Sequence, residues 1–215
     1  MPEAAPSIAE PNARTRLLLA ALDVIRARGY SATSVDQICA AAGVTKGGFF
    51  HHFASKEALA VAAADFWSLT TGALFADAPY HRHADPLDRV LGYIDFRAGL
   101  LDGPVERFTC LVGTMVQEAF ATSPAIRDAC EASISGHART LEADIAEAMT
   151  RYGVTGTTAA CLALHTQAVL QGGFILAKAR GGPEAAADSV AHLKRYFTLL
   201  FGPGATNDHR QTRKD

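Results

Sequence analysis

Apolar residues recur at helical spacing along most of this chain, and short breaks rich in glycine and proline separate the segments that show it. The run LLLAALDVI (17–25) has this spacing, and Gly29 follows it as a helix stop. The motifs DGP, TSP, GVTG and GGP interrupt the second half of the chain in the same way. Alternating runs of β-branched residues are scarce. The sequence therefore predicts an all-α protein of about nine helices.

Capping residues and stops locate the expected helices. Ser34 and Gln37 have the spacing of a capping box, so a short helix should begin after Ser34 and end before Gly43. Thr45 can cap the next helix, and Ser55 the start of a fourth that runs through residue 74. Further helices are expected at 87–101, 105–121, 125–152, 157–180 and 184–201.

Composition places the chain among folded proteins with one core, or a small module packed on a larger one. It has 215 residues, of which 49% are hydrophobic and 20% charged. No apolar run is expected to be long enough for a membrane span, and the amino terminus lacks the apolar segment of a secretory signal. The expected location is therefore the cytoplasm. The four cysteines form no CxxC pair and are expected to be reduced, buried thiols, with oxidant sensing by Cys110, Cys130 or Cys161 as the alternative.

Charge is unevenly distributed along the chain. The whole chain carries a formal charge of −2, yet residues 14–56 contain six basic and only two acidic residues. A local charge of +4 suits a small anion-binding head on a larger neutral or acidic body.

The stretch GVTKGGFFHHFASKEAL (43–59) contains the strongest functional pattern. A short helix, a glycine at the turn and a second helix form the arrangement of a helix-turn-helix, whose second helix enters the DNA major groove. Gly43 suits the positive φ of a tight turn, and Cys39 is small enough for two crossing helices to approach. Phe49 and Phe53 are expected to close the core of this head.

The expected DNA-facing residues are polar, basic or small. Thr45, Lys46, Gly47 and His51 would offer hydroxyl, ammonium, bare backbone and imidazole groups to base edges and phosphates. Gly47 is a poor helix former, by about 1 kcal/mol relative to alanine, which is understandable where a backbone must lie against another surface. Ser34 and Val35 belong to the same expected contact set. Lys56, at the start of the next helix, is expected at a phosphate.

From residue 16 to residue 59 the chain resembles the DNA-binding domain of the tetracycline-repressor (TetR) family. The matching motifs are G-Y-x-x-T-S-V-x-x-I (29–38) and A-G-V-T-K-G-G-F-F-H-H-F-x-S-K-E-A-L (42–59). The resemblance implies an all-α homodimeric regulator with a three-helix head and a larger body that holds a small-molecule pocket. It also implies that Thr45, Lys46, Gly47, Phe50 and His51 face DNA, with His52 and Lys56 at the backbone.

Phe50 departs from the family pattern. This position is usually tyrosine, whose hydroxyl binds a phosphate, whereas Phe50 offers only apolar contact with a thymine methyl group or a sugar.

Metal binding and binding of a phosphate group by a glycine-rich loop are two alternatives to DNA binding. His51 and His52 form a pair that evokes a metal site, but adjacent helical residues point about 100° apart and do not easily share one ion. The loop with His81 and His83 is read as an exposed polar loop for lack of partner ligands. A phosphate-binding loop is disfavoured because no strand precedes GVTKGG and the GxxxxGK[ST] spacing is absent. The sequence predicts no metal and no cofactor.

Two histidines lie on apolar faces in the second half of the chain. His137 follows Ile134 on one helix stripe, and His165 follows Leu162 on another. Each is either a satisfied core or interface residue or a polar group in a ligand pocket. The expected companions in a pocket are Phe96, Phe108, Met115 and Gln117.

The last two helices are expected to form the dimer interface. Gly172 and Gly173 would allow another helix to approach closely, and Val190, Leu193, Phe197 and Leu200 form the stripe of the final helix. The resemblance implies a four-helix interface between two subunits. The alternative is that this stripe closes the core of a single subunit.

Together these observations predict a regulator in four parts: a disordered leader (1–12), a helix-turn-helix DNA-binding domain (13–60), a helical ligand-binding and dimerisation domain (61–202) and a disordered tail (203–215). A dimer would bind double-stranded DNA at a palindromic operator and act as a repressor that an unknown small molecule releases. The alternatives are a small helical enzyme that uses His137 or His165 as acid and base, and a DNA-binding protein that responds to no effector.

Overall fold

The computed structural model describes residues 11–202. The expected tail (203–215) and most of the expected leader (1–12) lie outside the described residues. Asn12 is described, and its side chain accepts a hydrogen bond from the Thr15 N–H at 2.9 Å. This cap sets the start of the first helix at Ala13.

The described residues form ten α-helices and one short 3₁₀ helix, with no strand among them. The all-α prediction is confirmed. The elements are α1 (Ala13–Arg28), α2 (Val35–Ala42), α3 (Lys46–His52), α4 (Lys56–Ala76), η1 (Pro79–Arg82), α5 (Pro86–Gly99), α6 (Val105–Phe108), α7 (Leu111–Ala119), α8 (Pro124–Tyr152), α9 (Ala159–Arg180) and α10 (Glu184–Leu200).

One expected helix is broken in two. The sequence predicted a single helix over 105–121, but Thr109 has extended backbone angles (φ −80°, ψ 156°) and separates α6 from α7. Cys110 then caps the start of α7, with its Sγ accepting a hydrogen bond from the Gly113 N–H at 3.4 Å. Neither glycine nor proline marks this break, which is why the sequence pattern missed it.

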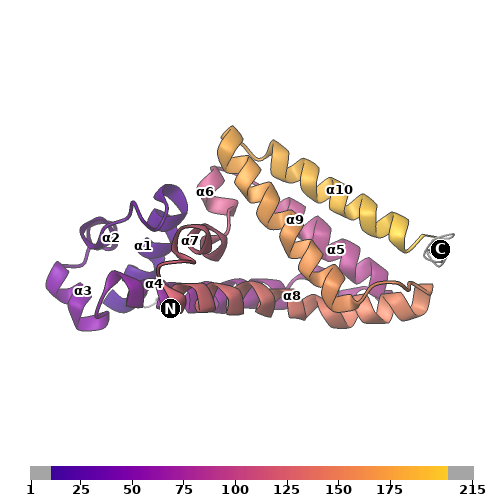
Figure 1. Cartoon of the computed structure of the whole chain (residues 1–215), viewed down its shortest axis with the longest axis horizontal. Helices are drawn as coiled ribbons and strands as arrows, with labels where there is room; N and C mark the ends of the chain where they lie inside the picture. Colours follow the sequence, from indigo (N-terminus) through magenta and orange to yellow (C-terminus); the bar gives the residue numbers. More distant parts are fainter. Residues whose placement is uncertain (1–10, 203–215) are drawn as a thin grey trace, which may run out of the picture.

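The helices form an elongated molecule with a small head at one end (Figure 1). Helices α1, α2 and α3 make the head, from which α4 leads into the body alongside the long helix α8. Helices α9 and α10 slope across the other end of the body, where they pack on each other and on α8 and α5 respectively.

Two apolar clusters hold the molecule together. The first joins the head to the start of α4, α7 and the start of α8, and includes the fully buried Leu17, Phe49 and Met115. The second lies between α5, α8, α9 and α10, and includes Tyr93 and Phe197. Because α4, α7 and α8 take part in the first cluster, the head is packed on the body rather than tethered to it.

Two helical segments are long and apolar enough to cross a membrane by length and composition, namely Lys56–Arg82 and Ala159–Arg180. The expectation that no segment would meet that standard was therefore wrong. Alanine raises their mean hydropathy without long runs of large side chains. Both are core-forming helices of the body, α4 against α8 and α9 against α8 and α10.

Candidate DNA interface and ligand cavity

The corner between α2 and α3 has the local geometry that its residues predict. Ser34 Oγ accepts a hydrogen bond from the Gln37 N–H at 3.2 Å, while Gln37 Oε1 accepts one from the Ser34 N–H at 2.8 Å. Gly43 adopts a left-handed conformation (φ 62°, ψ 36°) at the end of α2. Thr45 Oγ1 accepts a hydrogen bond from the Gly48 N–H at 3.1 Å and so caps α3. The predicted capping box, turn and cap are confirmed.

The apolar residues of the corner hold α3 against the rest of the head. Ile38 and Phe49 are completely buried, and Cys39 and Phe53 are nearly so. The rings of Phe49 and Phe53 lie 5.9 Å apart, centre to centre. The expectation that these two phenylalanines close the head is confirmed, and their burial fixes the side of α3 that faces outward.

The outward side of α3 carries the residues expected at DNA. Thr45, Lys46, Gly47, Phe50 and His51 are all exposed, and Phe50 keeps 52% of its surface in solvent. Lys46 Nζ lies 3.0 Å from Asp36 Oδ1, with both side chains more than half exposed. Such a pair stabilises a fold by well under about 1 kcal/mol, so a phosphate can replace the carboxylate at little cost.

The two glycines of α3 are glycine for different reasons. A Cβ added at Gly48 would lie 2.9 Å from Val44 Cγ1, so internal packing requires a glycine there. A Cβ added at Gly47 would meet nothing closer than Thr45 Oγ1 at 4.0 Å. The fold itself therefore leaves room for a side chain at Gly47, on the exposed side of the helix.

The remaining residues of the predicted contact set lie at the border of this surface. Ser34 is exposed, whereas Val35 and His52 are partly exposed. Lys56 differs from the expectation, because its ammonium group donates to Tyr30 O at 3.0 Å and to Thr33 O at 2.9 Å. It also lies 4.3 Å from the centre of the Tyr30 ring. These contacts give Lys56 a role inside the head and make it the least available cation for a phosphate.

Metal-binding groups do not gather at the histidines of α3. The rings of His51 and His52 lie 5.0 Å apart, edge to face. Within residues 11–202, no three His, Cys, Asp or Glu side chains come together as metal ligands.

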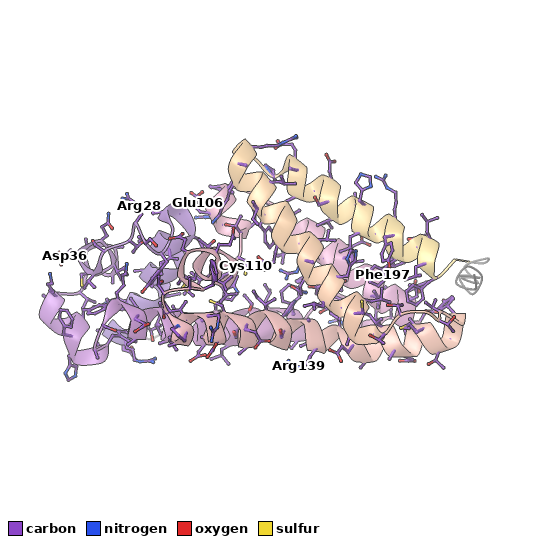
Figure 2. All side chains as sticks on the ribbon, viewed as in Figure 1. Arg28, Asp36, Glu106, Cys110, Arg139 and Phe197 are labelled. Atoms are coloured by element: carbon purple, nitrogen blue, oxygen red, sulfur yellow. The ribbon has the colours of Figure 1, made fainter. Side chains whose placement is uncertain are left out.

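The body contains a cavity of about 350 Å³ between α4, α5, α6, α7, α8 and α9. Most of its wall is apolar, with aromatic rings from three different helices. Cys110, which lines it, lies between the head and the α9–α10 pair (Figure 2). The aromatic residues of the wall are Trp67, Phe75, Phe108 and Phe174, and its polar residues are Ser68, Thr71, Arg97, Arg107, Ser133, His137, Thr140, Gln167 and Gln171.

A polar network lies at one wall of this cavity, centred on the buried hydroxyl of Tyr93. Arg97 Nε donates to that oxygen at 3.0 Å, and Gln167 Nε2 donates at 3.3 Å. The hydroxyl proton is therefore left for the third neighbour, His137 Nε2, at 3.0 Å. In this arrangement His137 is neutral, accepts at Nε2 and carries its own proton on Nδ1.

The electrostatics of the wall favour the same neutral state. Burial, and secondarily the positive charge of Arg97, lower the pKa of His137 to about 3. The Phe75 ring lies 4.6 Å from that of His137, which adds to its desolvation. His137 is thus an uncharged hydrogen-bonding group beside a charged arginine.

Two of the six residues expected in a pocket line this cavity, Phe108 and His137. Met115 is instead fully buried in the cluster next to the head, and Gln117 is exposed on α7. Phe96 lies behind Phe75, at 5.4 Å between ring centres. These three residues do not line this cavity, because helical spacing indicates a buried face without showing which neighbour covers it.

His165 is also absent from the cavity. It is exposed on α9, and its ring lies 5.3 Å from that of Tyr196 on α10. The polar cavity residues of α9 are Gln167 and Gln171, which the sequence reasoning missed together with Arg97. Arg97 follows Tyr93 by four residues on α5, so an arginine beside an apolar helix face was the available signal.

The residues expected at a dimer interface lie mostly inside one subunit. Val190, Leu193 and Phe197 are at most 3% exposed, and Phe197 lies among the side chains between α10 and its neighbours (Figure 2). A Cβ added at Gly173 would lie 3.3 Å from Ala186 Cα, so this glycine serves the packing of α9 on α10. These four residues close the core of the subunit. Gly172 and Leu200 are partly exposed.

Other residues of α9 and α10 form an exposed apolar face. It begins near Leu164 and continues past Gly172, at which an added Cβ would meet nothing within 4 Å. The large apolar residues of this face are Leu164, Ile175, Leu176, Tyr196 and Leu199, each at least 41% exposed.

Three contacts connect the cavity region to the head. Arg26 of α1 donates to the backbone oxygen of Arg107 at 2.9 Å, and its guanidinium lies 5.3 Å from the centre of the Trp67 ring. The Glu118 carboxylate accepts hydrogen bonds from the backbone N–H groups of Tyr30 and Ser31, at 3.2 and 2.7 Å. Arg107 and Trp67 both line the cavity.

Models of known protein families match both the head and the body of the molecule. Residues 17–63 match the family model "Bacterial regulatory proteins, tetR family". Residues 86–188 match the model "Transcriptional regulator LmrA/YxaF-like, C-terminal domain". A curated relative, the uncharacterised HTH-type transcriptional regulator YerO of Bacillus subtilis (strain 168), is 32% identical over 54 residues. That match covers 25% of this chain but only 19% of YerO.

Solved structures resemble the whole described molecule. A TetR transcriptional regulator from Chloroflexus aurantiacus has a TM-score of 0.76 and 26% identity, over 87% of this chain and 95% of its own. A regulatory protein TetR from Rhodobacter sphaeroides has a TM-score of 0.76 and 25% identity, over 86% of this chain and 98% of its own. The family models for the head and the body and the solved structures with this fold all point to the same family. The chain belongs to the TetR family of DNA-binding transcription regulators.

Proposed function

We propose that this protein is a repressor that binds a palindromic operator as a dimer and leaves it when a small molecule fills the cavity. Family membership makes it a transcription regulator rather than an enzyme. The observation that carries the DNA part of the proposal is the exposed side of α3. Gly47 leaves room there for a close approach, and Thr45, Lys46 and His51 are exposed on the same short helix.

The residues of this surface have chemically distinct parts in the proposed complex. Thr45 and Lys46, at the start of α3, reach base edges and phosphates, and the backbone at Gly47 approaches the DNA closely. His51 faces the groove, and His52 the backbone. Phe50 makes apolar contact with a thymine methyl group or a sugar.

We place the dimer interface on the exposed apolar face of α9 and α10. A two-fold axis would pack this face on the same face of a second copy, and Gly172 leaves space for close approach. Exposed leucines and an isoleucine on two adjacent helices are costly in water when they gather in a patch, and such patches are typical of subunit interfaces. Such a dimer presents two α3 helices to the two half-sites of a palindrome.

Release would follow from the contacts between cavity and head. A ligand that moves Trp67 or α6 also moves partners of Arg26 on α1, and so changes the position of the head. The ligand then favours subunit arrangements that fit the operator poorly, with a typical coupling of about 1–3 kcal/mol.

The two glycines of α3 provide the test. Gly47→Ala should leave the free energy of unfolding equal or raise it, by up to about 1 kcal/mol, because alanine is the better helix former and has room. The same variant should weaken operator binding at least about tenfold if the backbone lies against DNA. Gly48→Ala is the matched control, and should lower stability because of the contact with Val44.

Binding is measured by fluorescence anisotropy with the upstream intergenic DNA at several salt concentrations, alongside urea unfolding of each variant. A Gly47→Ala protein that is stable and binds DNA like the parent would contradict the proposed surface. Binding indifferent to both sequence and salt would contradict operator recognition altogether. An operator complex that no small molecule dissolves would favour the effector-independent alternative.

A further inference from the structure

The cavity wall is positively charged. Among its described residues are two arginines, Arg97 and Arg107, and no aspartate or glutamate. His137 is neutral in the network described above, so it does not offset or add to this charge. A cavity with uncompensated positive charge is complementary to an anion and disfavours a cation.

Arg97 is fixed in place with part of its hydrogen-bonding capacity unused. Its Nε donates to Tyr93, and its guanidinium carbon lies 4.6 Å from the centre of the Phe75 ring. Among residues 11–202, Arg97 forms no salt bridge, and its two terminal nitrogens make no hydrogen bond. A planar group with two free N–H donors on one side is suited to a carboxylate.

Uncharged donors and acceptors adjoin Arg97. Gln167 and His137 both line the cavity and both contact the same Tyr93 hydroxyl as Arg97. Because the Tyr93 oxygen receives two donors and gives its proton to His137, the position of every member is fixed by another. The arginine is therefore oriented before any ligand arrives, which lowers the entropy cost of binding.

The rest of the wall suits an aromatic body. Trp67 and Phe75 come from α4, Phe108 from α6 and Phe174 from α9, so rings surround the space on several sides. A cavity of about 350 Å³ lies at the lower end of the usual range for small-molecule sites, about 300–1,000 Å³. One or two rings with a short side arm would fill it.

We propose that the effector is a small aromatic carboxylate, with its carboxylate on the Arg97 guanidinium and its ring among Trp67, Phe75, Phe108 and Phe174. This inference rests on the proposed function for its regulatory consequence, but binding itself is independent of DNA. The carboxylate oxygens accept the two free N–H groups of Arg97, and a neutral or cationic analogue forfeits that charge-assisted interaction.

Three probes with the same phenyl body test the charge preference. They are 4-phenylbutanoate, its amide 4-phenylbutanamide and the cation 4-phenylbutylammonium, each titrated into the full-length protein by isothermal titration calorimetry. Trp67 is the one tryptophan of the chain and lines the cavity, so quenching of its fluorescence reports occupancy of this site. The carboxylate should bind at least about tenfold more tightly than the amide, and the cation most weakly.

Arginine variants identify the group responsible. Arg97→Gln should reduce the preference for carboxylate over amide to about twofold or less, and Arg97→Lys should retain part of it because the charge remains. Arg180→Gln is the matched control, since Arg180 is exposed at the end of α9 and does not line the cavity. It should bind all three probes like the parent. Circular dichroism and thermal unfolding check that each variant is folded.

Several results would overturn the inference. These are equal binding of carboxylate and amide, tighter binding of the cation, a preference that survives in a folded Arg97→Gln protein, or no binding of any probe.

The operator complex distinguishes this inference from the proposed function. If a carboxylate binds through Arg97 but leaves the operator complex intact, the proposed release by a ligand is contradicted and the proposed carboxylate site is supported. If a neutral or cationic molecule releases the operator and the protein shows no preference for carboxylates, the proposed carboxylate site is contradicted and the proposed release by a ligand is supported.

Discussion

The neutral state of His137 in the cavity wall predicts how the free energy of unfolding changes with pH. His137 has a pKa of about 3 in the folded protein, against 6.5 for an unperturbed histidine. The cause is burial first and the charge of Arg97 second. Because the unfolded chain takes up the proton at a higher pH than the folded protein, acid favours unfolding. The contribution of His137 to stability is thus complete above about pH 6.5 and is lost as the pH falls towards 3.

The size of the effect follows from the two pKa values. When the pH falls from about 7.5 to about 5, His137 becomes protonated in the unfolded state but not in the folded state. This protonation stabilises the unfolded state by the equivalent of roughly 1.5 pKa units, or about 2 kcal/mol. His137 is only partly buried by its surface area, so solvent screening reduces this to about 1–2 kcal/mol. The whole network opposes protonation, because Nε2 already accepts the Tyr93 proton.

The assay compares the parent with His137→Gln, whose side-chain oxygen can accept the same Tyr93 proton but does not titrate. Urea unfolding of both proteins at several pH values and one fixed protein concentration gives the difference in free energy. The other histidines contribute equally to both proteins and cancel. Between the two pH values, the parent should lose about 1–2 kcal/mol more than the variant. Identical pH profiles would refute the assignment of His137 as a neutral group in the folded protein.

Three further predictions concern the contacts that hold head, body and subunits together. Glu118→Ala frees the N–H groups of Tyr30 and the next residue, and should lower the free energy of unfolding by about 1 kcal/mol in urea titrations. Leu199→Glu should dissociate the proposed dimer in sedimentation equilibrium, whereas Leu69→Glu, at a similarly exposed leucine on α4, should not; dimers in both variants would exclude the α9–α10 face. Lys56→Met should cost about 1–2 kcal/mol of stability, because two backbone oxygens lose their donor. Lys56→Met should weaken operator binding less than Lys46→Met does. A larger loss of operator affinity in Lys56→Met would support the original expectation that Lys56 contacts a phosphate.

Short-range features of this protein were predictable from its sequence. The capping box at Ser34, the left-handed Gly43 and the cap at Thr45 are each determined by residues within a few positions of one another. The exposed side of α3 could be predicted for the same reason, since two buried phenylalanines fix the orientation of a short helix. The break at Thr109 was missed because it depends on tertiary packing, without a local glycine or proline.

The cavity and the subunit surface were harder to predict, and α9 shows why. Its inner face carries Leu162, Leu170 and Phe174, but its outer face carries Leu164 and Leu176. When both faces are apolar, helical periodicity does not identify the one that faces the core. The sequence reasoning therefore put His165 in a pocket and missed Gln167, two residues away.

The division of labour within α3 bears on how easily such a protein changes its target gene. Phe49 and Gly48 maintain the fold, while Thr45, Lys46, Gly47 and Phe50 contribute little to packing apart from one cap. Substitutions at the second group therefore leave the head intact, provided that position 45 keeps a capping side chain. With these residues at the operator, as we propose, such a regulator can be retargeted, by natural drift or by design, through a few codons without any compensating change in its core.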